Sequence, residues 1–327
     1  GCVVLDNGEK VQYDKLLVAT GSKPFVPPMK GLDEVEDKFT FMTWDSAKAI
    51  REKVTAGTKV LIIGAGLIGL KCAEALHHLN ADITVVDLAD RILPSILDVR
   101  AGEIMQKHIE DKGTKFILGT SVEQFSKNSA KLTNGDTVDF DILVVAVGVR
   151  PNTELVSDAG GKVEKGIITD LHQQTTIDNV YAAGDCTVSH DCSSNTDRIL
   201  ALLPNAFMQG EVAGKNMAGE ETLYLNAIPM NAIGFYGLHI ITAGSYDGDE
   251  DITEDADKEI YKKLVFKDGL LKGFILMGDV ARAGIYTSMI KEQIPLTEVD
   301  LDLLREKPQM MMFGKARREE KLAGKKH

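Results

Sequence analysis

The stretch Lys59–Gly69, KVLIIGAGLIG, decides the fold of this chain. Its first five residues are mostly β-branched and predict a buried strand, and its last six have the G-x-G-x-x-G pattern of a tight turn that opens a helix. A helical pattern continues through residues 70–79, residues 82–86 predict a second strand, and Asp87 follows at once. This order of elements is typical of a dinucleotide-binding unit built on a parallel sheet.

The three glycines of this stretch have different tasks in such a unit. Gly64 permits the tight turn, Gly66 lets the backbone approach a pyrophosphate, and Gly69 allows the helix to pack closely on the strand. Backbone N–H groups at the positive end of the helix bind the phosphates. The residues that we expect to bind NAD are Gly64, Ala65, Gly66, Leu67, Ile68, Gly69 and Asp87. The plainer alternative is a glycine-rich turn without a ligand, and the well-spaced acid argues against it.

Asp87 bears on the choice of nucleotide. It lies 23 residues after Gly64, close to the spacing of about 20 residues expected for an acid that binds a ribose. A carboxylate at this position hydrogen-bonds a 2′-hydroxyl and repels a 2′-phosphate, so NADH is favoured over NADPH. Arg91 weakens this expectation slightly, because it could turn toward a phosphate.

The chain also contains an internal repeat. Leu5–Pro24, LDNGEKVQYDKLLVATGSKP, matches Leu132–Pro151, LTNGDTVDFDILVVAVGVRP, at a constant offset of 127 residues, with ten of twenty positions identical. Lys23 and Arg150 keep their charge across the two copies. Each copy predicts a hairpin about an Asn-Gly turn, followed by an apolar strand that ends in glycine. The pattern indicates two related nucleotide-binding units.

The first of these units should have a glycine fingerprint of its own. The offset places it roughly 63 residues before Gly1, since 64 − 127 = −63. We therefore expect the chain to lack most of its first nucleotide-binding unit. A chain with only part of a flavin site is expected to bind FAD weakly or not at all.

Composition narrows the possible functions. The net charge of −12 argues against a nucleic-acid partner, and the longest apolar run, residues 60–70, is too short for a membrane span. Four cysteines in 327 residues are too few for a disulfide scaffold, so reduced thiols and a cytoplasmic location are expected. The histidines are scattered, and we assign no metal site and no catalytic acid, base or nucleophile.

Four motifs in order resemble those of the pyridine nucleotide–disulfide oxidoreductases, of the NADH–rubredoxin reductase, NADH oxidase and nitrite reductase flavin-module type. They are Ala19-Thr20-Gly21, Gly64–Gly69 with Asp87, Gly148-Val-Arg-Pro-Asn152, and Val180-Tyr-Ala-Ala-Gly184-Asp185. The resemblance implies that FAD binds Thr20, Gly21, Gly184 and Asp185, and that Gly148 belongs to the NAD site. From the residues alone, Gly184-Asp185 would serve equally well as a helix cap or turn.

The resemblance also implies an α/β fold with two Rossmann-like domains and a small α+β C-terminal domain. The expected divisions are residues 1–28 and 151–223 for a partial FAD-binding domain, 29–150 for the NAD-binding domain, and 224–327 for the C-terminal domain. The C-terminal domain resembles that of NADH–rubredoxin reductases, which implies a homodimer. Within it, residues 261–278 predict a hairpin about an Asp-Gly turn.

Three further features of the sequence involve charged residues. Lys71 stands where many relatives carry a Glu near the nicotinamide, and it could instead pair with Glu74 on the same helix face. The acidic run Asp247–Glu259 is expected to form a solvated loop. Residues 314–327 carry a net charge of +4 and are expected to form an exposed tail, with a docking patch for an acidic redox protein such as rubredoxin as the alternative.

Together these features predict an FAD-dependent NADH:acceptor oxidoreductase that passes hydride from NADH to flavin and electrons on to a rubredoxin-like carrier, dioxygen or a disulfide. An alternative is an NADH-sensing interaction protein of the same fold with incidental redox activity. A further alternative is that this chain by itself acts only as an NAD-binding module.

Overall fold

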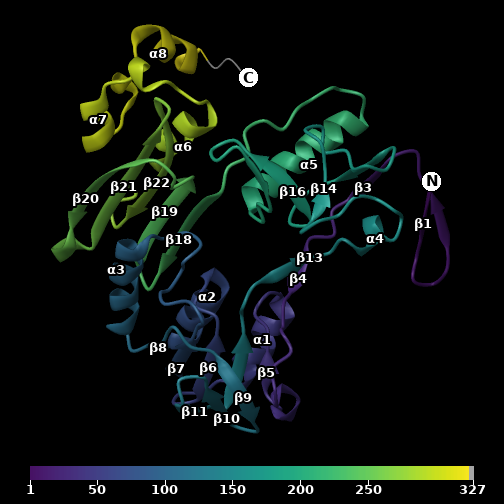
Figure 1. The fold of residues 1–327 in the computed structure, drawn as a ribbon, viewed down its shortest axis with the longest axis vertical. Coiled ribbons are helices and arrows are strands. Elements are labelled where there is room, and N and C mark those ends of the chain that lie inside the picture. Colours follow the sequence, from purple (N-terminus) through teal and green to yellow (C-terminus); the bar gives the residue numbers. More distant parts are fainter. Residues whose placement is uncertain (324–327) are drawn as a thin grey trace.

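A computed structural model describes residues 1–323 and arranges them in three units (Figure 1). The parallel-sheet unit contains the elements between residues 32 and 145, and the C-terminal unit begins after residue 229. The two-piece unit is assembled from the N-terminal strands and from the segment between residues 149 and 217. The mixed α/β architecture predicted from the sequence is confirmed.

The parallel-sheet unit has five parallel strands in the order β5-β12-β6-β7-β8. The helix after the glycine turn begins at Leu67, earlier than the sequence pattern predicted, because Gly66 is its N-cap. A second sheet, β11-β10-β9, is antiparallel. The elements are η1 (Leu32–Glu34), β5 (Lys38–Phe39), α1 (Trp44–Lys53), β6 (Lys59–Ile63), α2 (Leu67–His77), β7 (Asp82–Val86), α3 (Val99–Glu110), β8 (Lys115–Ile117), β9 (Val122–Ser126), β10 (Ser129–Leu132), β11 (Thr137–Asp139) and β12 (Ile142–Val145).

The two-piece unit joins segments far apart in the sequence. Strand β3 pairs in parallel with β15, so the carboxyl ends of these two strands lie side by side. Its elements are β1 (Cys2–Val4), β2 (Lys10–Gln12), β3 (Leu16–Val18), β4 (Ser22–Pro24), β13 (Val149–Pro151), α4 (Glu154–Ser157), β14 (Ile167–Ile168), β15 (Val180–Ala182), β16 (Thr187–Asp191), β17 (Thr196–Arg198) and α5 (Leu203–Met217).

Strands β4 and β13 form an antiparallel pair that connects the two-piece unit to the parallel-sheet unit (Figure 1). At its centre Lys23 lies opposite Arg150, the same two residues that correspond in the 127-residue repeat. The repeat is therefore visible in the structure as an approximate twofold relation about this pair. The chain passes between the two-piece and parallel-sheet units through β4 and returns through β13. We call β4 and β13 the hinge strands.

The C-terminal unit is an antiparallel sheet in the order β18-β19-β22-β21-β20, with α6 packed on it. The hairpin predicted about Asp268-Gly269 is present as β21 and β22. The elements are β18 (Met230–Phe235), β19 (Leu238–Gly244), β20 (Asp249–Asp255), η2 (Ala256–Lys258), β21 (Ile260–Lys267), β22 (Leu270–Met277), α6 (Ala283–Lys291), η3 (Leu296–Glu298), α7 (Leu301–Glu306), η4 (Met310–Met312) and α8 (Lys315–Leu322).

The acidic run Asp247–Glu259 was wrongly expected to form a loop. Most of it is the edge strand β20, paired along its length with β21. Its charges are tolerated because three of its acids meet basic side chains of other elements: Glu250 with Lys263, Asp251 with Arg305, and Glu254 with Arg100. Charges on an edge strand also discourage pairing with another chain.

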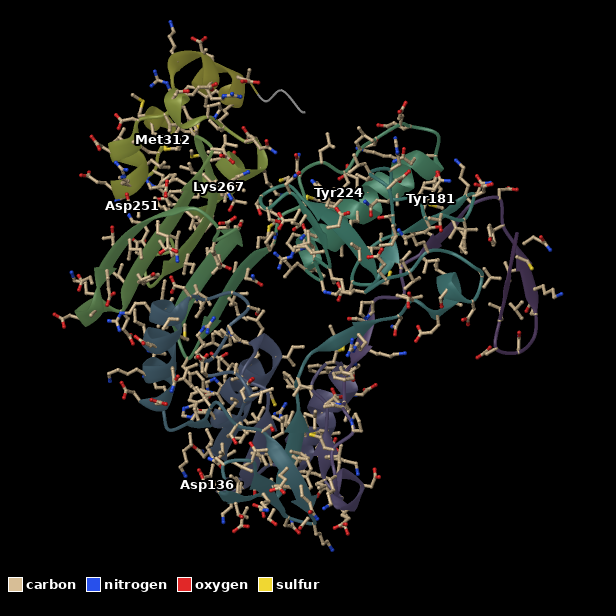
Figure 2. All side chains as sticks on the ribbon, in the orientation of Figure 1. Asp136, Tyr181, Tyr224, Asp251, Lys267 and Met312 are labelled. Atoms are coloured by element: carbon tan, nitrogen blue, oxygen red, sulfur yellow. The ribbon has the colours of Figure 1, made fainter. Side chains whose placement is uncertain are left out.

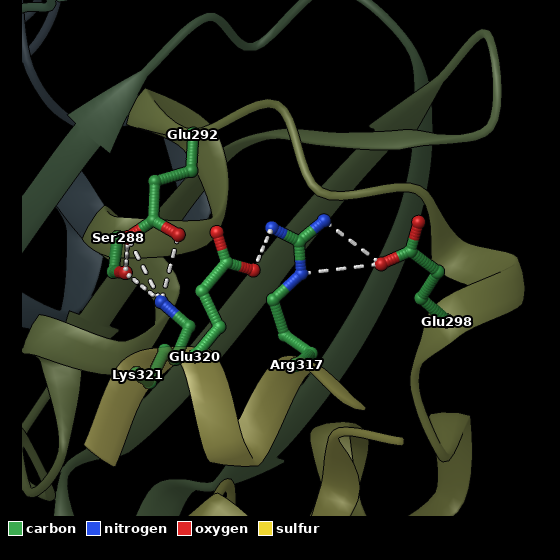
Figure 3. A network of polar contacts seen from close by, with 6 residues as sticks. All are labelled: Ser288, Glu292, Glu298, Arg317, Glu320 and Lys321. Atoms are coloured by element: carbon green, nitrogen blue, oxygen red, sulfur yellow. Dashed lines mark hydrogen bonds and ion pairs between the residues drawn. The ribbon is translucent and has the colours of Figure 1, made fainter. Parts of the chain in front are cut away.

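Residues 315–322 form the helix α8 rather than an irregular tail, and Lys315 and Leu322 on it are exposed as expected. Figure 3 shows that Arg317 bonds Glu298 and Glu320, and that Lys321 bonds Glu292 and Ser288. These contacts neutralise two of the basic side chains that a docking patch would need. Lys325 and Lys326 lie outside the described residues.

The parallel-sheet and C-terminal units share one apolar core. Ile62 and Leu70 of the first belong to the same buried cluster as Phe235 and Ile240 of the second. By contrast, Asp136, beside the β10–β11 turn, lies at the end of the molecule opposite the C-terminal unit (Figure 2). The C-terminal unit therefore covers one side of the parallel-sheet unit and leaves its far end open.

A buried polar cluster reinforces this contact. Lys263 on β21 lies 3.1 Å from Asp98 at the start of α3, and Tyr261 donates a hydrogen bond to the same carboxylate at 2.7 Å. Burial by itself would raise the pKa of Asp98, but the Ala101 N–H, the Tyr261 hydroxyl and the Lys263 ammonium together hold that pKa below its ordinary value. The cluster thus keeps Asp98 charged and ties the two units together.

Within residues 1–323, none of the helices has both the length and the apolar character that crossing a bilayer requires.

Candidate functional site

The glycine turn has the geometry that the sequence predicted. Gly64 has φ of 113°, and a Cβ on it would lie 2.4 Å from the Ala146 carbonyl oxygen. A Cβ on Gly69 would lie 2.0 Å from the Gly64 carbonyl oxygen, which explains why α2 can pack so close to β6. At Gly66, by contrast, no atom of residues 1–323 lies within 4 Å of an ideal Cβ, apart from those of Gly66 and its two chain neighbours.

The open space at Gly66 indicates whether a ligand could lie against this turn. Its φ of −84° and ψ of −175° suit any residue, and the surrounding protein leaves room for a side chain. The reason to keep a glycine is therefore space for something other than protein. Since this space lies in front of the first N–H groups of α2, a phosphate fits the position.

Asp87 lies directly beneath this turn, at the carboxyl end of β7. Its Oδ2 accepts a hydrogen bond from the Ala65 N–H at 2.6 Å, and its Oδ1 accepts one from the Ala89 N–H at 2.7 Å. These bonds orient the carboxylate and tie it to the glycine turn. Each oxygen keeps a second lone pair with which to accept a hydrogen bond from a ribose hydroxyl.

A cleft of about 810 Å³ contains most of the residues expected to bind NAD. Its size suits a small-molecule or cofactor site. The expected residues that line it are Gly64, Gly66, Leu67, Ile68, Asp87 and Gly148. Ala65 and Gly69 are not among the lining residues: the first bonds Asp87 through its N–H, and the second faces the strand.

Other lining residues were missed by the sequence reasoning. The walls include Phe25 and Pro27 after β4, Pro94 and Ser95 before α3, and Ala201 before α5. They come from three distant segments and carry no motif of their own. Spacing along the chain therefore gave no signal for them, and only the packing of the units brings them to the cleft.

The hinge strands join this cleft to the second group of expected residues. Thr20 Oγ1 donates to the Asn152 carbonyl oxygen at 2.7 Å, and Asn152 Nδ2 donates to the Thr20 carbonyl oxygen at 2.8 Å. The Asn152 N–H also donates to the Gly21 carbonyl oxygen at 2.9 Å. The motifs Ala19-Thr20-Gly21 and Gly148–Asn152 are therefore hydrogen-bonded to each other at the hinge strands.

Thr20, Gly21, Gly184 and Asp185 lie together at the carboxyl ends of β3 and β15. Ser22 donates a hydrogen bond to Asp185 Oδ2 at 3.3 Å, which links the two ends. Gly21 and Gly184 both have left-handed backbones, with φ of 63° and 86°. Ligands bind at such carboxyl ends in open α/β sheets, so these residues fit one side of a second dinucleotide site.

Gln209 on α5 supports that arrangement and was not identified from the sequence. Its Oε1 accepts the Gly184 N–H at 2.5 Å, and its Nε2 donates to Ser189 Oγ at 2.5 Å. The side chain is buried. Because it holds Gly184 from behind, Gln209 orients the turn that presents Asp185.

The cysteines form no redox pair in the described residues. Cys72, Cys186 and Cys192 are buried, and Cys2 is exposed on β1. Burial raises the pKa of Cys72 to about 12 and also raises the pKa of Cys192. Thiols in such surroundings are poor nucleophiles.

Comparisons with known proteins identify the family of this chain. The model of the pyridine nucleotide-disulphide oxidoreductases matches residues 1–210. The chain belongs to this family. A second model, the rubredoxin NAD+ reductase C-terminal domain, matches residues 229–294 of this oxidoreductase. Proteins of the family use FAD and NAD(H).

Two curated relatives and one solved structure illustrate the relationship. The oxidoreductase is 33% identical to the NADH-dependent phenylglyoxylate dehydrogenase subunit epsilon of Aromatoleum evansii, over 90% of this chain and 72% of that protein. It is 32% identical to the assimilatory nitrate reductase electron transfer subunit of Bacillus subtilis (strain 168), over 89% of this chain but 38% of that protein. A covalent putidaredoxin reductase–putidaredoxin complex shares the fold, with a TM-score of 0.85 and 22% identity over 94% of this chain and 75% of that one.

Proposed function

We propose that this oxidoreductase binds NADH in the 810 Å³ cleft and, together with FAD, passes electrons to a protein electron carrier. The observation that carries the proposal is the position of the hinge strands. One end of the pair lines the cleft that contains the glycine turn and Asp87. The other end adjoins Thr20 and Gly21, beside Gly184 and Asp185. A nicotinamide and a flavin held at these two ends would belong to one continuous site.

Each group of residues has a defined task in this proposal. The N–H groups at the start of α2 bind the NADH pyrophosphate, Asp87 binds the adenosine ribose, and Gly148 leaves space beside them. Thr20, Gly21, Gly184 and Asp185 hold the FAD. When bound, FAD accepts a hydride from NADH and supplies the redox chemistry. The protein contributes the orientation of the two groups.

A protein carrier is the acceptor that the observations favour. One relative is named as an electron transfer subunit, another as a subunit of an NADH-dependent dehydrogenase, and the solved neighbour is joined to putidaredoxin.

The test uses the full-length protein, which is expected to include the first nucleotide-binding unit and so to hold FAD. The FAD-loaded protein is mixed anaerobically with NADH, and an iron–sulfur carrier, dioxygen or a disulfide is then added. We expect NADH to bleach the flavin absorbance and the carrier to reoxidise it fastest. Binding of NADH without flavin reduction would contradict the proposal and favour an NADH sensor.

Nucleotide choice gives a prediction that needs no flavin. An Asp87→Ala variant is expected to bind NADH about tenfold more weakly, because it loses a charged hydrogen bond to the ribose worth about 1.5 kcal/mol. Its preference for NADH over NADPH should fall, and adding Leu88→Arg should strengthen NADPH binding, since Leu88 lines the cleft and is 74% exposed. Titration calorimetry with both nucleotides measures the change.

Asp111→Ala is the matched control, because Asp111 lies outside the cleft lining, is 64% exposed and pairs with Lys107. Its nucleotide affinities should equal those of the unsubstituted chain. An Asp87→Ala variant with unchanged discrimination would remove Asp87 from the ribose site.

We also propose the division of the chain at residues 28/29, 150/151 and 223/224. A homodimer formed through the C-terminal unit stays a prediction.

A further inference from the structure

One face of α2 serves both the cleft and the C-terminal unit. Leu67, Lys71 and Glu74 follow one another at intervals of four and three residues and so lie on the same side of the helix. Leu67 lines the NADH cleft. Lys71 and Glu74 instead contact residues 234–236, where β18 turns into β19. We call residues 234–238 the hairpin tip.

The contacts between this face and the hairpin tip are polar and specific. Lys71 Nζ donates to the Gly234 carbonyl oxygen at 3.1 Å and lies 5.5 Å from the centre of the Phe235 ring. Glu74 Oε1 accepts the Tyr236 N–H at 2.6 Å, and its other oxygen bonds the Lys71 ammonium. The Lys–Glu pair considered from the sequence therefore exists, but it is part of a contact between units.

The hairpin tip is itself rigidly held. Tyr236 and Gly237 have φ of 50° and 92°, as a tight hairpin turn requires. The Tyr236 hydroxyl lies 3.0 Å from Thr114 Oγ1, and the Tyr236 carbonyl oxygen lies 3.1 Å from His108 Nε2. Phe235 is fully buried in the core shared by the two units. The tip is thus a fixed support against which α2 can be positioned.

We propose that Lys71 and Glu74 are positioning residues, which set the nucleotide-binding end of α2 through the hairpin tip. This inference rests on the proposed function, because it concerns the same NADH cleft. The Asp87 carboxylate holds the turn before α2 through the Ala65 N–H, and the contacts of Lys71 and Glu74 with the hairpin tip hold the helix itself on its other side. A displacement of about 1 Å at a binding group can weaken its interaction severely.

The coupling is reciprocal. If the hairpin tip favours the binding position of α2, bound NADH must stabilise the hairpin tip by the same factor. Lys71 is not among the residues that line the cleft, so its effect on NADH binding would pass through α2. In this chain the lysine belongs to the C-terminal contact, where a glutamate would be repelled by Glu74 and by the Gly234 carbonyl oxygen.

The experiment measures NADH affinity and amide hydrogen exchange together in the full chain. Lys71→Met should weaken NADH binding about five- to tenfold, which is the lower range of typical coupling between sites. Lys71→Arg, which keeps the charge and a donor, should restore the affinity to within about twofold. Because the Lys71 side chain is 42% exposed, neither substitution threatens the fold, and circular dichroism verifies this.

Hydrogen exchange supplies the readout that a merely structural role would not change. In the unsubstituted chain, NADH should slow exchange in residues 230–240, and in Lys71→Met this protection should disappear. Lys48→Met is the matched control, since Lys48 forms an equally spaced pair with Asp45 on α1. It should leave both the affinity and the protection unchanged.

The two proposals fail differently. If the unsubstituted chain does not bind NADH, the proposed function fails. If it binds NADH, but Lys71→Met binds equally well or residues 230–240 show no protection, the coupling is overturned and the function stands.

Discussion

A Gly66→Val variant is expected to bind NADH at least about 100-fold more weakly, a loss of about 2.7 kcal/mol, while its fold is preserved. The backbone of Gly66 is extended, with φ of −84°, a conformation that valine adopts readily. Apart from Gly66 and its two chain neighbours, no described residue has an atom within 4 Å of an ideal Cβ at this position. The new side chain would therefore occupy the space that a pyrophosphate needs in front of α2.

The expected effect on stability is small by comparison. Valine is a poorer N-cap than glycine, which costs the helix about 0.5–1 kcal/mol. Titration calorimetry gives the affinity, and chemical denaturation gives the stability.

Gly214→Val is the matched control for this variant. An ideal Cβ on Gly214 likewise has no atom of residues 1–323 within 4 Å, apart from its chain neighbours and the adjacent backbone of α5. Gly214 does not line the cleft. Its NADH affinity should be unchanged. If Gly66→Val binds NADH within about threefold of the unsubstituted chain, the phosphate does not lie at this turn.

A Lys263→Met variant is expected to lose about 3 kcal/mol of unfolding free energy, as is typical when one partner of a buried ion pair is removed. Only 5% of the Lys263 side chain is exposed, and its ammonium lies 3.1 Å from Asp98 and 2.5 Å from Glu250. Without it, Asp98 remains partly buried with the Tyr261 hydroxyl and the Ala101 N–H as its partners. Urea unfolding followed by circular dichroism measures the loss.

Lys267→Met tests the same strand at an exposed position. Lys267 pairs with Asp247, and the two side chains are 45% and 82% exposed; Figure 2 labels Lys267 in the C-terminal unit. Water screens such a pair, so little change in stability is expected. Equal losses in the two variants would show that the polar cluster does not stabilise the contact between units.

The repeat and the nucleotide motifs could be predicted because they depend on local backbone requirements. Gly64 needs a left-handed backbone, and the Asn-Gly turns need the same at Gly8 and Gly135. Such requirements select particular residues at particular positions, so they remain readable along the chain. The pairing of Lys23 with Arg150 follows from the repeat once β4 and β13 are placed side by side.

The acidic run and the basic tail could not be predicted correctly in the same way. A run of like charges resembles a solvated loop until its partners are known. Glu254 meets Arg100, which is 154 residues away, and Arg317 meets Glu298, which is 19 residues away. The strand β20 and the helix α8 are therefore stabilised by neighbours that no local pattern reveals.

The amino-acid sequence by itself determined the order of the nucleotide-binding elements, the family to which the chain belongs and the positions of the glycine turns, because each depends on residues close together along the chain. Only the tertiary structure shows which distant segments complete the lining of the cleft. Only the tertiary structure shows why a lysine is stable at position 71 of α2. The physical reason is that Lys71 is stabilised by the Gly234 carbonyl oxygen, 163 residues away. Contacts at that separation depend on how whole units pack, and they leave no periodic signal in the sequence.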